Sequence, residues 1–282
     1  MKIKKSTWLL IIICITGLIL LLYPTVSNYW NTRHSTRVIS DYVEKLSSLD
    51  SEQFREEWDR SVEYNASLAD RINPFELTDR QKEQYPQLLD TSGSGIMGYI
   101  EIESLAVSLP LAHGTSDGVL QRGIGHLEWS SLPVGGENSH CVVSGHRGLP
   151  NMKLFTDLDK MKIGDVFTLN VLGNTLTYEV DKITTVKPDE LDSLKIERNC
   201  DLCTLVTCTP YGINTHRLLV RGHRVEGKNK NVRVISEAVL VDPFVIAPIV
   251  AFPLLFALFM IVMLKKPKKK ADLSDITKLP KK

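Results

Sequence analysis

Two uninterrupted apolar runs near the two ends of the chain set its organisation. Residues 8–23 form a run of 16 uncharged residues, and residues 244–264 form a run of 21. A helix of about 20 apolar residues is long enough to cross a bilayer. The second run stops at a cluster of lysines, so we expect a transmembrane helix over residues 244–264 and a basic cytoplasmic tail over residues 265–282.

The first apolar run is shorter and follows a basic start. Residues 1–23 are therefore either an uncleaved signal anchor or a cleaved signal peptide. No Ala-x-Ala site follows Tyr23, which favours the anchor. Both interpretations export the middle of the chain, and with an anchor both termini are cytoplasmic. Membrane lipid is thus an expected partner, through the apolar runs and the lysine tail.

Between the two runs, the spacing of apolar positions changes from helical to strand-like. Residues 24–72 are expected to be largely helical, because apolar residues recur at helical spacing from about residue 35, with a break near Ser51. Residues 73–95 lose this periodicity and contain prolines and glycines. We interpret them as an irregular loop or a short helix that forms a lid and linker.

Short alternating segments begin near Met97 and are separated by glycine-containing turns. Closely spaced short strands of this kind predict a β-sandwich or a β-barrel. We assign residues 96–228 to this domain and residues 229–243 to a linker before the second apolar run. The predicted strands are residues 98–103, 141–144, 166–172, 176–180, 204–208 and 217–221.

The charge of the exported part narrows the choice of partners. Residues 24–243 hold 23 Lys and Arg against 31 Asp and Glu, although the whole chain has a net charge of +1. An acidic domain is a poor match for a phosphate backbone. We therefore expect no nucleic acid as a partner.

Four cysteines, Cys141, Cys200, Cys203 and Cys208, fall in the exported part. In an oxidising compartment they could form two disulfides, and the last three also suggest a metal site. Strand alternation places Cys203 and Cys208 on opposite faces, which argues against a shared metal ion, and we expect none. A small buried side chain is the simplest interpretation of Cys141, Cys200 and Cys203.

Cys208 differs because it ends an apolar strand and precedes a turn, where a thiol can reach a substrate. A free thiol has a pKa of about 8.5 and only its thiolate attacks well, so it needs a basic or cationic partner. His146 follows another apolar strand, and Arg217 lies nine residues after Cys208. A Cys, a His and an Arg together can attack a carbonyl, move a proton and stabilise an oxyanion. Either partner alone is more often an ordinary surface or core residue.

The segment from Thr204 to Gly222 resembles the active-site segment of class C sortases, the pilus-building type. Further blocks that resemble the same family follow one another in the right order. The similarity covers roughly residues 70–225, and the second apolar run fits class C rather than class A. These further blocks are residues 111–115, 125–128, 131–136, 145–150 and 154–160.

The resemblance implies a mainly β fold: a closed sortase-type β-barrel with an N-terminal helical region and flanking transmembrane helices. It implies a cysteine transpeptidase of the cell membrane, with Cys208 as nucleophile, His146 as general acid/base and Arg217 stabilising the oxyanion or orienting the substrate. No cofactor is implied.

The substrates implied are pilin subunits with a Leu-Pro-x-Thr-Gly type sorting signal, cleaved between Thr and Gly and joined to a pilin lysine. Attachment of surface proteins to peptidoglycan is an alternative. A non-catalytic pilus assembly platform is another, although Cys208, His146 and Arg217 together argue against it.

Class C sortases also carry a lid with an Asp-Pro-aromatic motif over the catalytic cysteine. The corresponding residues here are Asn73, Pro74 and Phe75. Phe75 can fill an apolar groove, whereas Asn73 cannot carry a charge to Arg217. We therefore expect a lid without the charged latch, and a plain turn before a short helix is the alternative.

Overall fold

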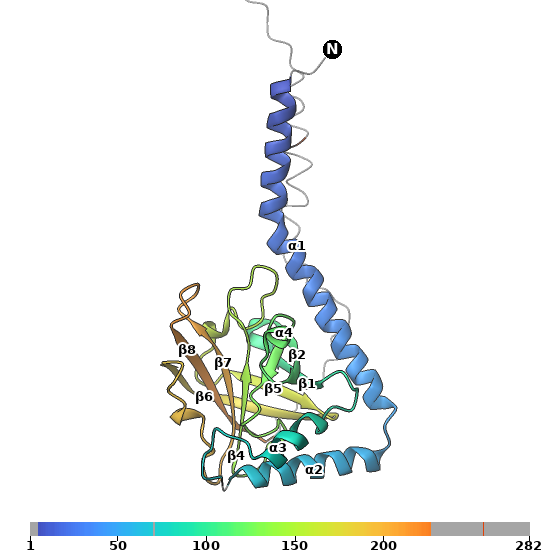
Figure 1. Cartoon of the computed structure of the whole chain (residues 1–282), viewed down its shortest axis with the longest axis vertical. Helices are drawn as coiled ribbons and strands as arrows, with labels where there is room; N and C mark the ends of the chain where they lie inside the picture. Colours follow the sequence, from blue (N-terminus) through green and yellow to red (C-terminus); the bar gives the residue numbers. More distant parts are fainter. Residues whose placement is uncertain (1–4, 70, 227–255, 257–282) are drawn as a thin grey trace, which may run out of the picture. The chain divides into compact units, whose positions relative to one another are not determined.

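The computed structural model describes residues 5–69, 71–226 and 256. The chain divides into two units, Met1–Val234 and Ile235–Lys282, and every described residue except Phe256 belongs to the first. In that unit, long helices precede a closed β-barrel (Figure 1).

Two helices begin the described chain. Helix α1 (Lys5–Ser47) continues through the boundary expected at residue 23, and α2 (Ser51–Ala69) follows. Asp50 caps α2, because its Oδ1 accepts hydrogen bonds from the main-chain N–H groups of Glu52 (3.0 Å) and Gln53 (2.8 Å). The Gln53 side chain accepts in return from the N–H of Asp50 at 3.2 Å, which completes a capping box. This cap explains the helix restart near Ser51.

Among the described residues, one helical stretch, Ile12–Ser47 of α1, is long and apolar enough to cross a membrane by length and composition. None of its most apolar window is buried inside the protein. Leu20 and Leu21 are 68% and 77% exposed, which is costly in water and favourable in lipid. The second apolar run, residues 244–264, lies outside the described residues apart from Phe256.

Eight strands close into a barrel in the order β1-β2-β3-β4-β7-β8-β6-β5, and β5 pairs with β1. Most neighbours are antiparallel, but β2 pairs with β3 and β4 pairs with β7 in parallel. The expected fold class, a mainly β closed barrel preceded by helices, is confirmed. The strands are β1 (Ile96–Ile102), β2 (Val107–His113), β3 (Ile124–His126), β4 (Ser139–Ser144), β5 (Val166–Val171), β6 (Asn174–Val186), β7 (Asp201–Thr209) and β8 (His216–Arg224).

Short helices occupy several of the connections. Two of them, α3 and η1, lie within residues 73–95, where the sequence predicts an irregular loop or a short helix. The short helices are α3 (Asp79–Gln84), η1 (Tyr85–Gln87), η2 (Glu103–Leu105), α4 (Asp117–Leu120), η3 (Leu158–Lys160) and η4 (Asp192–Leu194).

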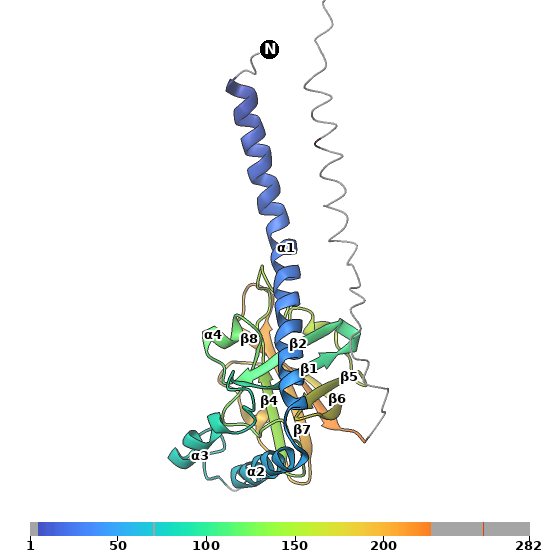
Figure 2. The same ribbon diagram turned by 90° about the vertical axis from the view of Figure 1, so that its right-hand side faces the viewer.

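Apolar side chains form two large cores. One fills the barrel interior, and the other joins the helices to the barrel wall. Tyr42 of α1 belongs to the second core, and its hydroxyl donates to the carbonyl of Met97 (2.9 Å) and accepts from the N–H of Leu172 (3.0 Å). Figure 2 shows α1 passing in front of β1 and β2. The C-terminal half of α1 therefore packs on the barrel as part of the same folded unit.

Candidate active site

Cys208 and Arg217 are direct neighbours across two antiparallel strands. Cys208 lies at the end of β7, and the register pairs it with Arg217 near the start of β8. Both are partly exposed, whereas Cys203 on the opposite face of β7 is fully buried in the barrel. The strand alternation expected from the sequence thus turns Cys203 inward and leaves Cys208 on the outer face.

His146 leaves β4 beside the same end of β7. The parallel register pairs Ser144 with Val206, and the N–H of Gly145 donates to the carbonyl of Val206 at 3.0 Å. The Thr207 hydroxyl donates to the carbonyl of Gly145 at 2.8 Å, with Thr207 itself buried. These bonds fix the chain immediately before His146 to the chain immediately before Cys208.

Arg147 and Tyr211, which the sequence analysis did not single out, join the two loops that follow His146 and Cys208. The Arg147 guanidinium donates to Asp159 at 2.5 Å and to the Thr209 hydroxyl at 3.4 Å, and it lies 5.9 Å from the centre of the Tyr211 ring. A Cβ on Gly148 would meet Tyr211 at 2.8 Å. The only sequence signal for these contacts is adjacency to the two candidate catalytic residues.

Among the described residues, the Arg217 guanidinium is held by main-chain groups and pairs with no acid. Its Nη1 donates to the carbonyls of Asn214 (3.2 Å) and His216 (3.1 Å). None of the ion pairs formed among the described residues involves Arg217. Its positive charge is therefore available to an oxygen of a substrate.

An apolar patch on the outer face of the barrel precedes the strand end that carries Cys208. We call it the outer patch, and its buried members are Val142, Leu194, Val206 and Leu219. Val206 lies two residues before Cys208 and therefore on the same face of β7. Leu127, Trp129, Val186 and Leu191 pack around its edge. The partly exposed edge residues of the patch can contact apolar side chains of a peptide that reaches Cys208.

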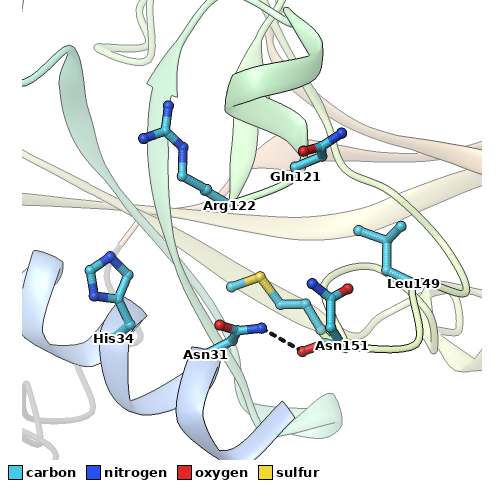
Figure 3. Close-up of a pocket in the computed structure, with 7 residues that line it drawn as sticks. Asn31, His34, Gln121, Arg122, Leu149 and Asn151 are labelled. Carbon is cyan, nitrogen blue, oxygen red and sulfur yellow. Dashed lines mark hydrogen bonds between the residues drawn. The ribbon is translucent and has the colours of Figure 1, made fainter. Parts of the chain in front are cut away.

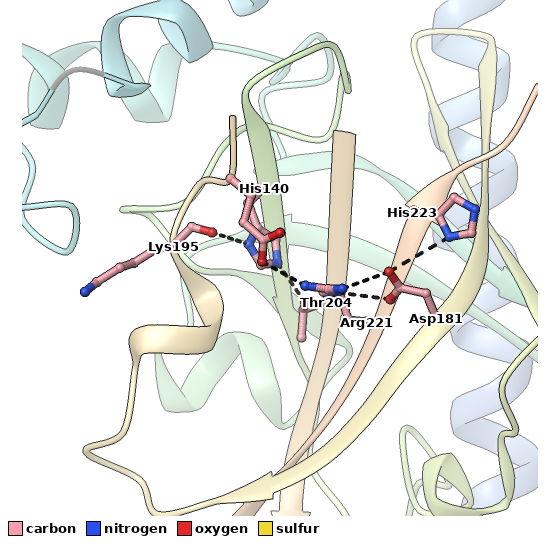
Figure 4. Close-up of polar contacts among 7 residues, drawn as sticks. His140, Asp181, Lys195, Thr204, Arg221 and His223 are labelled. Carbon is pink, nitrogen blue, oxygen red and sulfur yellow. Dashed lines mark hydrogen bonds and ion pairs between the residues drawn. The ribbon is translucent and has the colours of Figure 1, made fainter. Parts of the chain in front are cut away.

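A polar network anchors the β6–β7 connection at the other end of the same strands (Figure 4). His140 of β4 pairs through Nε2 with the Thr204 hydroxyl (2.7 Å) and through Nδ1 with the carbonyl of Lys195 (2.8 Å). Arg221 of β8 donates to both carboxylate oxygens of Asp181, at 3.0 and 2.9 Å. Burial lowers the pKa of His140, so the ring stays neutral, with its proton on Nδ1 facing the Lys195 carbonyl.

Arg221 links this polar network to the β6–β7 connection a second time. Its Nη1 donates to the carboxylate of Glu197 at 2.8 Å. The connection that supplies Leu191 and Leu194 to the outer patch is therefore held by Lys195 and Glu197 immediately after them.

The segment expected to form a lid packs on the edge of the outer patch. The Phe75 ring meets Trp129 edge-to-face at 5.1 Å between centroids, and Nζ of Lys195 lies 5.9 Å from the Phe75 centroid. Asn73 accepts through Oδ1 from the N–H of Phe75 at 3.1 Å, which closes a local turn with Pro74, a residue that has no N–H, in its middle. Among the described residues, the ring contacts of Phe75 are with Trp129 and Lys195. That residues 73–75 cover Cys208 stays a prediction.

The remaining exported cysteines lie away from Cys208. Cys141 and Cys203 are register partners on β4 and β7 and are buried in the barrel core, and Cys200 is half-buried. All are free thiols. Burial raises the pKa of Cys203 well above its ordinary value. Within the described part of the chain, no cluster of three or more His, Cys, Asp or Glu side chains could hold a metal ion.

Comparison with known proteins agrees with this geometry. The family model of the sortase domain matches residues 100–225. Sortase D of Bacillus subtilis is 30% identical over 131 residues, which are 45% of this chain and 63% of that protein. Sortase A of Bacillus anthracis is 26% identical over 160 residues, which are 55% of this chain and 74% of that protein.

Solved structures of class C sortases are more similar still. Sortase C1 from Streptococcus agalactiae is 49% identical, covers 68% of this chain and 99% of that chain, and has a TM-score of 0.66. Sortase C of Streptococcus pneumoniae is 44% identical, with coverages of 68% and 97% and a TM-score of 0.62. Sortase C of Clostridium perfringens is 45% identical, with coverages of 68% and 100% and a TM-score of 0.60.

The sortase domain and the sortase relatives indicate a cysteine transpeptidase, and a partly exposed thiol beside an arginine at the end of a closed barrel fits that class. The chain belongs to the sortase family, and its similar solved structures are class C sortases.

Proposed function

We propose that this chain is a pilin-polymerising sortase in which Cys208 is the nucleophile, His146 the general acid/base and Arg217 the oxyanion-stabilising group. The register pairing of Cys208 with Arg217 carries the proposal, because it sets a thiol and an unpaired guanidinium side by side at one strand end. The hydrogen bonds of Gly145 bring His146 to the same end.

The proposed reaction has two acyl transfers. The Cys208 thiolate attacks the Thr carbonyl of a Leu-Pro-x-Thr-Gly type signal, and Arg217 stabilises the negative charge that develops on the oxygen. The Thr–Gly bond breaks, and His146 gives its proton to the departing Gly amine. A lysine amine of a second pilin then attacks the thioester and gives a proton to His146, and Cys208 leaves as thiolate.

The outer patch supports an apolar peptide as the donor substrate. Its buried residues lie on the same face as Cys208 and before it along β7, where the Leu-Pro part of a signal would lie if its Thr reaches the thiol. The similar sortase C of Clostridium perfringens was solved with the C-terminal cell wall sorting motif. The study of the similar Streptococcus pneumoniae enzyme addresses pilin substrate specificity.

The acceptor amine is tested by mass spectrometry. The full-length enzyme in detergent is mixed with a candidate pilin, and tryptic fragments are searched for a Thr-to-Lys isopeptide bond. We expect this bond with the wild-type enzyme and not with Cys208→Ala. In a second reaction, both a pilin lysine and a peptidoglycan amine are supplied. If the Thr carbonyl is then found on the peptidoglycan amine, the enzyme attaches proteins to the cell wall and the pilus-assembly proposal is wrong.

We also propose that the enzyme is anchored in the cell membrane with the barrel outside. The apolar part of α1 supports one span, and the sequences of residues 244–264 and 265–282 support a second span followed by a cytoplasmic tail. Protease added to intact protoplasts should then degrade the barrel and spare an epitope placed in residues 265–282. A protected barrel would overturn this topology.

A further inference from the structure

Helix α1 and the loop that carries His146 are joined by two side-chain hydrogen bonds between residues 120 or more positions apart. The amide nitrogen of Asn31 donates to the carbonyl of Asn151 at 2.8 Å. The amide oxygen of Asn28 accepts from the N–H of Lys153 at 2.9 Å. Positions 28 and 31 are one turn apart, so both side chains leave the same face of the helix.

The partner chemistry fixes the direction of each bond. A main-chain carbonyl can only accept, so Asn31 must act as the donor. A main-chain N–H can only donate, so Asn28 must act as the acceptor. The two asparagines therefore have opposite requirements although they are chemically identical.

The loop that carries His146, residues 146–156, is closed at its base by two hydrogen bonds. The N–H of Phe155 donates to the carbonyl of His146 at 3.2 Å, and the N–H of Gly148 donates to the Thr156 hydroxyl at 3.1 Å. Phe155 is 1% exposed, which anchors this base in the barrel core. In the tip of the loop, residues 149–153, Met152 is buried in the barrel core and the Lys153 side chain donates to the carbonyl of Leu105 at 3.3 Å. Helix α1 adds a support at the main chain of Asn151 and Lys153.

A pocket lies beside the contact, although Met152 of the tip packs in the barrel core. A pocket of about 380 Å³ opens between α1 and the loop, with His34 on one side, Arg122 and Gln121 on the other, and Leu149 and Met152 from the loop (Figure 3). Figure 3 shows the Asn31–Asn151 bond crossing from the helix to the loop at the edge of this pocket. Two hydrogen bonds therefore bridge the helix and the loop beside an open space.

We propose that Asn28 and Asn31 are positioning residues: they hold the tip of the 146–156 loop on α1 and thereby fix His146 for proton transfer. Asn31 lies eight residues beyond Tyr23, the last residue of the first apolar run, and so about 12 Å along the same helix. The helix that we expect to anchor the protein is thus also part of its catalytic support. This inference rests on the proposed role of His146.

Aspartate substitutions test it, because Asp accepts but cannot donate when ionised. Asn28→Asp keeps the acceptor, Asn31→Asp loses the donor, and Thr32→Asp places the same charge on an exposed position of the same helix. Turnover of a Leu-Pro-x-Thr-Gly peptide is measured with the full-length proteins in detergent. We expect Asn31→Asp to lower kcat about fivefold with little change in KM, from the typical net value of one hydrogen bond.

The two controls decide the outcome. Asn28→Asp and Thr32→Asp should keep kcat within twofold of the wild type, and Asn28→Leu should lose activity to about the same extent as Asn31→Asp. Wild-type turnover in Asn31→Asp overturns the inference, as does an equal loss in all three aspartate variants, which would report charge alone. His146→Ala, measured in parallel, tests the proposed function separately: if it stays active, the role of His146 is wrong whatever the asparagines do.

Discussion

Strands β4, β7 and β8 carry two polar sites on one outer face, and these sites differ in how completely their groups are paired. In the network around Thr204, both ring nitrogens of His140 have hydrogen-bond partners, and both carboxylate oxygens of Asp181 accept from Arg221. Four residues along β7, about 13 Å away, Cys208 and Arg217 are partly exposed, and the guanidinium has no acidic partner within the part of the chain that the structure describes. The paired site stabilises the fold, and the unpaired site is left with donors and charge for a substrate.

The largest effect should come from removing the thiol at the unpaired site. Cys208→Ala should abolish peptide cleavage and the thioacyl intermediate seen by intact-mass spectrometry, because no other group nearby can form it. Cys203→Ala is the matched control on the same strand. It should keep the intermediate while losing a few kcal/mol of stability at most, from a small cavity. Equal loss of activity in both variants would point to a second role for Cys203.

The two arginines of β8 offer the sharpest contrast between the sites. Arg217→Lys should lower kcat about 100-fold with an unchanged melting temperature, because a lysine keeps the charge but loses the planar pair of donors. Arg221→Lys should do the reverse: it loses its two-pronged bond to Asp181, which costs about 1–2 kcal/mol of stability, and it keeps kcat. Kinetics and thermal melts of both variants measure this. Near-normal turnover in Arg217→Lys would show that charge alone suffices.

His140, in the polar network around Thr204, should make the free energy of unfolding depend on pH. Burial lowers the pKa of His140, beside Arg221, Glu197 and Asp181, so the folded ring stays neutral where the unfolded ring takes up a proton. The free energy of unfolding should therefore fall as the pH drops below about 6.5, by at most about 1.4 kcal/mol per pH unit from this residue. Burial lowers the pKa of His113 as well, which adds in the same direction.

Urea unfolding at pH 7.5 and pH 5.5 measures this effect. His140→Gln should be less stable than the wild type at pH 7.5, yet lose less on acidification. An equal loss in both proteins would show that other groups account for the acid sensitivity.

The smallest expected effect concerns Phe75, which packs on Trp129 at the edge of the outer patch. If residues 73–75 cover Cys208, Phe75→Ala should speed alkylation of Cys208 by a few-fold, and Asn73→Asp should slow it through a new pair with Arg217, more at low salt. Peptide-level mass spectrometry separates Cys208 from Cys200. Unchanged rates in both variants favour a plain turn.

Local pattern was sufficient for most of the barrel but not for all of it. The prediction for β5, residues 166–172, is close to the observed Val166–Val171. The strand predicted at residues 217–221 extends in the structure to Arg224 as β8. β2 and β3 were missed, because β2 contains Pro110 and β3 has only three residues, the middle one being Gly125. Both are strands only because neighbouring strands supply their pairing.

The sequence by itself determined the fold class, the family and the residues with the chemistry to react, because alternation, turn residues and a specific order of motifs are local properties. Only the tertiary structure decided which of these residues meet. The parallel pairing of β4 with β7 brings His146 to the end that carries Cys208, and the register of β8 sets Arg217 opposite that cysteine. Helix α1 reaches the loop of His146 through Asn28 and Asn31, a contact between positions more than 100 residues apart, which no local pattern specifies.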